Sequence, residues 1–236
     1  MEEKVAYEEP TFVMDERKEA IVGELMRNVY VWMTGGLALT GVIAWVTANS
    51  PEMLKLVNNQ AIMWILAFAE LFLVIALSAF IEKMRFLTAG IMYTIYCAMN
   101  GLTLSFIFLV YELGSIANIF FVTAGSFAGL AFIGTVIKKD LSKMGTFLII
   151  ALFGLVIASI VGLILGRPES IWMSVIGVII FAGLTVYDAQ KIRELMLSRE
   201  EVDEGSMKLA LLGALSLYLD FINLLLRLLS LFAKKK

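Results

Sequence analysis

The sequence contains no histidine and only one cysteine, and both shortages narrow the range of functions open to it. Without histidine there can be no Ser-His-Asp triad, no imidazole zinc site and no histidine pH switch. Because Cys97 stands alone, it can form neither an internal disulfide nor a cysteine metal cluster. From the sequence as a whole we expect no firmly bound metal, no cofactor, no enzymatic activity and no nucleic-acid partner. Proton chemistry near neutral pH would have to use carboxylates.

Charged residues are also scarce, because they make up 17% of the chain while 60% of the residues are hydrophobic. The mean hydropathy is +0.88, and a soluble domain is usually about 45–50% apolar. The apolar residues fall in blocks of about twenty, the length that crosses roughly 30 Å of hydrocarbon. Because an open sheet cannot satisfy its backbone in lipid, the composition predicts an all-α membrane protein.

Seven apolar blocks are long enough to span a membrane, and the short connections between them often contain glycine or proline. They cover residues 29–48, 61–81, 86–110, 116–137, 146–165, 171–190 and 207–233. The sequence therefore predicts one seven-helix transmembrane domain over residues 29–236. Residues 1–28 read as a charged cytoplasmic arm, helical from about Asp15, without the pattern of a cleavable signal peptide.

Lysine and arginine near the span ends predict the orientation. Most of the 19 basic residues lie in segments that face the cytoplasm if the N-terminus is inside. This balance predicts a multi-pass protein of the cytoplasmic membrane with its N-terminus inside and its C-terminus outside. The three lysines at positions 234–236 do not fit this pattern, because they would lie outside. They leave open an alternative in which the seventh segment does not fully cross the membrane.

Apart from charges at the very ends of the predicted spans and in loops, the charged residues are Glu70, Asp188, Asp220 and Arg227. A charge at the centre of a membrane helix costs about 2.5–3.5 kcal/mol on insertion scales, so such residues usually face the bundle interior and pair. Asp220, Asn223 and Arg227 are spaced by three and four residues and share one face of the last helix. Glu70 is the natural partner for Arg227. Their pairing can also serve only to hold two helices in register.

Asp188 and Asp220 are expected to meet. The sixth and seventh spans are joined by a short connection and should pack antiparallel. The last segment is about 40 Å long against a hydrocarbon core of about 30 Å, which leaves room for the two carboxylates to come level. Two carboxylates in contact cannot both be ionised cheaply, so the pair is expected to share one proton and to titrate as a unit. Loss of that proton would make the two helices repel each other.

Three motifs extend this prediction: "ALSLYLDFINLLLRLL" in the last span, "TVYDAQKI" in the sixth and "MNGLTLSFI" in the third. Together they resemble the bacterial branch of the Bax inhibitor family, the transmembrane Bax inhibitor motif proteins. The resemblance implies a last helix surrounded by the other six and a pH-sensitive calcium leak whose two aspartates fall on Asp188 and Asp220. It also implies a basic latch at the inner end of the second span that holds Asp188. This position falls on Lys83, with Arg85 two residues further on.

The function expected from the residues and the resemblance together is a Ca²⁺ leak controlled by proton occupancy at Asp188 and Asp220. Ca²⁺, protons and the lipid bilayer are then the partners. A first alternative is an adaptor that binds and restrains other membrane proteins and carries no ion flux. A second is an intramembrane aspartyl protease, although the context Leu217-Tyr218-Leu219-Asp220 lacks the glycines that such a protease needs. A proton-coupled carrier would require paired broken helices, which the sequence does not indicate.

Overall fold

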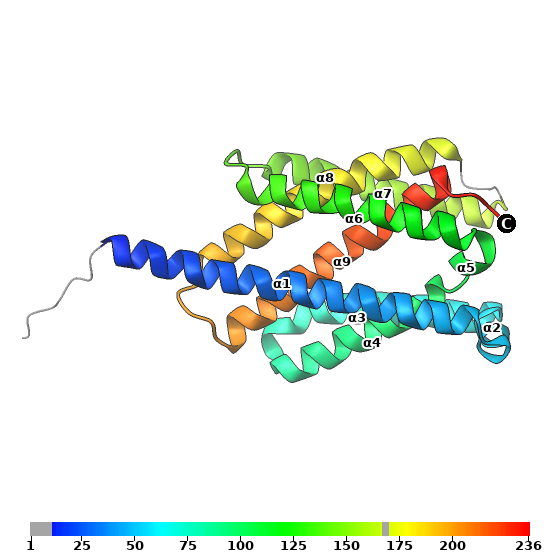
Figure 1. Cartoon of the computed structure of the whole chain (residues 1–236), viewed down its shortest axis with the longest axis horizontal. Helices are drawn as coiled ribbons and strands as arrows, with labels where there is room; N and C mark the ends of the chain where they lie inside the picture. The colour runs from blue at the N-terminus through cyan, green and yellow to red at the C-terminus, as the bar shows by residue number, and fades with distance from the viewer. Residues whose placement is uncertain (1–10, 167–169) are drawn as a thin grey trace, which may run out of the picture.

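The computed structural model describes residues 11–166 and 170–236, and these form a bundle of long helices (Figure 1). In chain order the described elements are the α-helices and one 3₁₀ helix, η1: α1 (Thr11–Ala48), α2 (Pro51–Val57), α3 (Gln60–Phe80), η1 (Ile81–Lys83), α4 (Phe86–Leu104), α5 (Ile107–Val110), α6 (Leu113–Val136), α7 (Ser142–Ile164), α8 (Ile171–Leu197) and α9 (Glu204–Phe232). Over this described part of the chain, extended pairing is limited to an isolated bridge between Tyr111 and Lys235. The all-α prediction is confirmed.

Seven segments of the described chain are long and apolar enough to cross a membrane. They are Glu16–Ala48, Gln60–Lys83, Phe86–Val110, Leu113–Val136, Ser142–Gly162, Ile171–Leu197 and Glu204–Phe232. Each predicted span coincides with one of them, which confirms the seven-span prediction. The larger differences in length are at the ends of helices that continue past the apolar block into polar sequence.

The first helix is longer than expected. α1 runs without a break from Thr11, four residues before the predicted start near Asp15. Val22, Leu25 and Met26 are buried within this N-terminal part and belong to the main core. The proposed boundary at residue 28 therefore falls in the middle of a continuous helix. A cytoplasmic arm over residues 1–28 remains a prediction, and residues 1–10 lie outside the described part.

The third span is interrupted near its end. α4 stops at Leu104 and the short α5 begins at Ile107. At the break, the Ser105 side chain donates to the carbonyl oxygen of Leu102 at 2.7 Å, and the Ser105 backbone N–H points to the same oxygen at 3.2 Å. A serine hydroxyl that bonds a nearby carbonyl competes with the helical pattern, which explains why a continuous apolar block does not form one helix.

The last helix is the centre of the bundle. In its most apolar stretch 67% of the residues are buried, whereas the other six spans reach 44% at most. Figure 1 shows α9 passing between a group formed by α1, α3 and α4 and a group formed by α6, α7 and α8. Within the bundle α9 packs against α1, α4, α6 and α8. The predicted central C-terminal helix is thus confirmed.

The start of α9 is fixed by a capping box. The Ser206 N–H donates to the Asp203 carboxylate at 2.7 Å, and the Asp203 N–H donates to the Ser206 hydroxyl oxygen at 2.8 Å. These bonds satisfy donors that the first helical turn would leave open. The Ser206 N–H also lowers the pKa of the Asp203 carboxyl below its usual value, because it stabilises the ionised form.

The C-terminal tail closes the opposite end of the bundle. The Glu112 N–H donates to Lys234 O at 3.0 Å, and the Lys236 N–H donates to Val110 O at 2.9 Å. The tail therefore lies beside the connection between α5 and α6, at the end of the bundle away from the start of α1 (Figure 1). This arrangement favours a seventh helix that runs the full length of the bundle over one that turns back.

Candidate functional site

The site begins with Asp188, which the motif "TVYDAQKI" places on α8. Its carboxylate accepts a hydrogen bond from the Ser216 hydroxyl of α9 at 2.6 Å. The positive charge of Lys191, one turn further along α8, also acts on this carboxylate. Asp188 is only partly buried. It is therefore a carboxylate with one short hydrogen bond and a neighbouring cation, both of which stabilise its ionised form.

Asp220 has a very different environment. Its side chain is 5% exposed, and its Oδ2 atom is buried without a hydrogen-bond partner. It lies four residues after Ser216 and so occupies the same face of α9, one turn from the residue that binds Asp188. Asp188 is close enough to act on Asp220 electrostatically. A buried carboxylate beside a second carboxylate and with an unpaired oxygen is a costly arrangement for a charged group.

Small residues bring the two helices close enough for this contact. Ala189 on α8 and Ala210 and Ala214 on α9 are fully buried. A Cβ added at Gly213 would come within 3.0 Å of the Ile192 side chain, so the backbone of α9 lies almost against α8. Small residues at such positions let membrane helices approach each other. The close approach allows a side chain as short as serine to bridge from α9 to Asp188.

Gln190, two residues after Asp188, fixes the neighbouring connection between α6 and α7. Its amide group donates to the carbonyl oxygens of Ile137 at 3.1 Å and Lys139 at 2.8 Å, and its oxygen accepts from the Leu141 N–H at 3.0 Å. Three bonds from one side chain hold this connection against α8. Gln190 belongs to the motif "TVYDAQKI", but the motif alone did not indicate this role.

The predicted basic latch is not among the contacts of the described residues. The Lys83 ammonium lies 5.9 Å from the centre of the Phe80 ring on its own chain segment, and no contact there joins Lys83 or Arg85 to Asp188. The segment that carries both residues instead meets the first turns of α9. Lys208 donates to Glu82 O and Met84 O, each at 3.1 Å. A latch to Asp188 remains a prediction.

Glu70 belongs to a separate polar network. Its carboxylate accepts hydrogen bonds from Thr103 and from Asn100 of α4, the latter at 3.3 Å. Asn100 in turn accepts from the Tyr218 hydroxyl of α9 at 3.0 Å, and that hydroxyl lies 2.6 Å from the Thr40 hydroxyl of α1. The network joins α3, α4, α9 and α1 through the core. The signal for it was present in the sequence as Asn100 and Tyr218, within two of the three family motifs.

The expected pairing of Arg227 with Glu70 remains a prediction. Arg227 lies on the α8 side of α9, where its side chain packs over Gly177 so closely that a Cβ there would come within 2.8 Å of Arg227 Cδ. Glu70 is on α3, and among the described elements α3 packs mainly on α2, η1 and α4. Asn223 bonds to the backbone oxygen of Leu219 at 2.8 Å, within α9 itself.

Removing the Tyr218 hydroxyl is expected to destabilise the bundle. Tyr218 is fully buried, and Tyr218→Phe would take a hydrogen-bond partner from both Thr40 and Asn100. Hydrogen bonds between membrane helices contribute about 0.6–2 kcal/mol each, so we expect a loss of about 1–3 kcal/mol in thermal unfolding in detergent. Tyr111→Phe is the control, since no hydrogen bond of the Tyr111 hydroxyl occurs in the described part. Equal stability of both variants would contradict a structural role for the network.

Within residues 11–166 and 170–236, no three or more histidine, cysteine, aspartate or glutamate side chains come together as a metal site would require. The chemistry available to Asp188 and Asp220 is therefore that of two neighbouring carboxylates. They can hold and release a proton, and their oxygens can interact transiently with a passing hard cation.

Comparison with known proteins identifies the family. The family described as "Inhibitor of apoptosis-promoting Bax1" matches residues 22–236, which include α8, α9 and every site residue named above. The chain belongs to the Bax inhibitor family. Inner membrane protein YbhL of Escherichia coli K12 is 44% identical over 214 residues, which cover 89% of this chain and 92% of YbhL. A protein of Deinococcus radiodurans is 41% identical over 213 residues, covering 89% and 90% of the two chains.

This Bax inhibitor family protein thus matches its relatives along nearly their whole length. A relative from Borreliella burgdorferi, 34% identical over 224 residues, covers 94% of this chain and 97% of its own. The shared region contains all seven apolar helices, including the central α9. Together with the name of YbhL, the seven helices support a multi-pass protein of the inner membrane.

Proposed function

We propose that this protein is a pH-sensitive cation leak of the inner membrane, with Ca²⁺ as the permeant ion, gated by a proton that Asp188 and Asp220 share. The observation that carries the proposal is the buried Asp220 carboxylate, whose Oδ2 atom has no hydrogen-bond partner and which lies beside a second carboxylate. A structural role alone would be served better by a paired or neutral side chain, because an unpaired buried charge is destabilising.

The switch follows from the different surroundings of the two aspartates. Ser216 and Lys191 stabilise a negative charge on Asp188, whereas Asp220 is in a more apolar setting. The shared proton therefore resides on Asp220. When it leaves, two negative charges face each other across the α8–α9 contact and repel. Such repulsion acts directly on the packing of the central helix, so proton occupancy can select between two arrangements of the bundle.

Calcium as the permeant ion is part of the proposal and comes from the family resemblance. Hard divalent cations take oxygen ligands, and a negatively charged constriction favours cations over anions. An N-terminus in the cytoplasm would put the Asp188 end of α8 near the inner face, in line with the distribution of lysine and arginine.

The proposal is tested by measuring Ca²⁺ flux from liposomes that contain the purified protein, at several pH values on either side of neutrality. We expect flux above that of protein-free liposomes, with a rate that changes with pH. The direction of that change reveals which protonation state is the open one. As a control, the same protein-containing liposomes are loaded with a membrane-impermeant organic dye. The dye should stay inside if the path is selective for ions.

The absence of flux at every pH would favour the adaptor function. In that case the protein would act by binding other membrane proteins, and the two aspartates would contribute only to packing. Co-purification of a defined membrane partner from crosslinked cells, unaffected by Asp220→Asn, would then be the expected result. Flux that does not change with pH would support the cation leak but contradict its control by a shared proton.

A further inference from the structure

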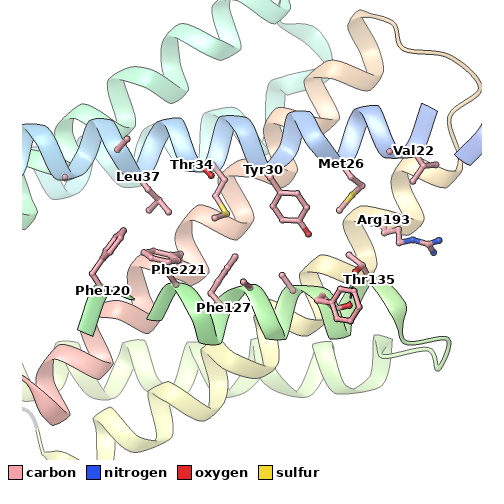
Figure 2. Close-up of a pocket in the computed structure, with 18 of the residues that line it drawn as sticks. Val22, Met26, Tyr30, Thr34, Leu37, Phe120, Phe127, Thr135, Arg193 and Phe221 are labelled. Carbon is pink, nitrogen blue, oxygen red and sulfur yellow. Dashed lines mark hydrogen bonds between the residues drawn. The ribbon is translucent and has the colours of Figure 1, made fainter. Parts of the chain in front are cut away.

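A long groove runs between α1 and α6 on the side of the bundle (Figure 2). Its volume is about 1110 Å³, and its floor is formed by α9 through Phe221. Figure 2 shows Tyr30 reaching from α1 toward α6, with Phe127 and Phe120 standing along the opposite wall. The groove opens to the outside of the bundle, because Val42 and Phe132 line it and are themselves exposed.

The groove is more than long enough for the acyl chains of one lipid. Along α1 its lining extends from Glu19 to Val42, which is roughly 35 Å at 1.5 Å per residue. The whole hydrocarbon core of a bilayer is about 30 Å thick, and the acyl chains of one lipid cover about half of it. Its walls in between are almost entirely apolar. In a membrane such a space is filled by acyl chains, because an empty cavity forfeits the van der Waals contacts of its lining.

Two glycines keep the groove open. Gly23 and Gly41 both line it, and a Cβ added to either would meet no atom within 4 Å. These positions on α1 could therefore carry side chains without any steric conflict within the protein. By contrast, Gly36 on the same helix is required by packing, since a Cβ there would overlap Tyr93. The missing side chains at Gly23 and Gly41 therefore widen the groove, and no other part of the protein fills the space.

The polar end of the groove has charges of both signs. Among the described residues that line it, the charged ones are Glu19 on α1 and Arg193 on α8. Figure 2 shows Arg193 at the end of the groove where Val22 and Thr135 lie, and Glu19 precedes Val22 by about one turn of α1. Arginine binds phosphate oxygens in a two-pronged manner. A carboxylate disfavours a phosphate but attracts an ammonium group. A headgroup that contains both a phosphate and an amine complements this pair better than a purely anionic one.

We propose that the groove binds one phospholipid with an aminoethyl-phosphate headgroup, whose phosphate contacts Arg193, whose ammonium contacts Glu19 and whose acyl chains lie over Phe127 and Phe221. The bound lipid separates α1 from α6 and packs directly on the central helix. This inference does not depend on the cation leak, because the groove residues named for it are not Asp188 or Asp220 and its test is a binding measurement.

The test uses the purified full chain, stripped of lipid in detergent and titrated with palmitoyl-oleoyl phosphatidylethanolamine, with binding read by native mass spectrometry. We expect one lipid per chain and weaker binding of the phosphatidylglycerol with the same chains. Gly23→Leu fills the groove near the proposed headgroup site and should weaken binding by about tenfold or more. Gly35→Leu is the matched control, because Gly35 is on the same helix, is exposed, has open space for a Cβ and does not line the groove.

The headgroup contacts are tested separately. Arg193→Gln should weaken binding of both lipids by about tenfold, the loss that corresponds to one charge-assisted contact of about 1.4 kcal/mol. Glu19→Gln should remove the preference for phosphatidylethanolamine and leave phosphatidylglycerol binding unchanged or stronger. Unaltered binding in Gly23→Leu would overturn the site. The site would also be overturned if the lipid-free protein formed a dimer in which crosslinks join the α1–α6 grooves of the two copies. The groove would then be occupied by a second chain and not by a lipid.

Discussion

Asp220→Asn is expected to abolish the pH dependence of Ca²⁺ flux in proteoliposomes while leaving the fold intact. Asparagine has nearly the same shape as protonated aspartic acid, so the α8–α9 contact would be held permanently in its proton-bound form. Asp188→Asn should also abolish the pH dependence, because it removes the charge that would repel Asp220. Since the two residues form a single titrating unit, the double variant should resemble either single variant rather than add their effects.

The matched control for this series is Glu200→Gln, which neutralises an exposed carboxylate in the connection between α8 and α9. Its pH profile should equal that of the unsubstituted protein. Thermal unfolding of every variant in detergent shows whether a change in flux reflects gating or a loss of structure. If both aspartate variants keep the parent pH profile, the shared-proton switch is wrong, whatever their absolute rates of flux.

Gly134→Ala is expected to have the largest effect on stability of any single methyl group added to the bundle. Gly134 lies on α6 against α8, where a Cβ would overlap the backbone oxygen of Val186 and come within 2.9 Å of the Ala189 Cβ. Neither atom belongs to a flexible side chain that can move aside. Overpacking of this kind costs about 1–3 kcal/mol and sometimes more. The strain would also fall on the turn of α8 that carries Asp188.

Gly129→Ala on the same helix is the control for that prediction, because a Cβ there meets no atom within 4 Å. It should be neutral or slightly stabilising in thermal unfolding, since alanine favours a helix over glycine by up to about 1 kcal/mol. Equal unfolding temperatures for the two variants would contradict the close contact between α6 and α8. If Gly134→Ala folds but loses pH-dependent flux, the packing at this turn and the gating are coupled.

The number of helices could be predicted from the sequence, because the length of an apolar block sets whether a helix can span the bilayer. The central place of α9 was implied by the family resemblance and not by its composition. The antiparallel packing of the last two spans could be predicted from their short connection. The Ser216 bond to Asp188 was not predicted, because it depends on how the two helices are rotated about their axes.

The contacts of Glu70, Arg227 and Tyr218 could not be predicted in the same way. Each depends on the rotation of a helix about its own axis and on which helix lies next to it, and neither is fixed by depth in the membrane. The described hydrogen bonds of Glu70 go to Asn100 and Thr103 of α4, whereas the Arg227 side chain packs over Gly177 of α8. The break after Leu104 depends on one serine hydroxyl, and serine is common in helices that do not break.

The ribosome synthesises the most deeply buried helix after the six other spans. Because chains grow at about 5–20 residues per second, these six membrane segments exist for some time before α9 does. In the folded structure α9 packs against α1, α4, α6 and α8, so the faces that it covers lack this partner until it is made. A premature stop near residue 203 would therefore remove the central helix of the bundle and not a peripheral one. In such a fragment Tyr93 and Tyr96 would lack the Tyr218 ring that packs against both of them in the complete bundle.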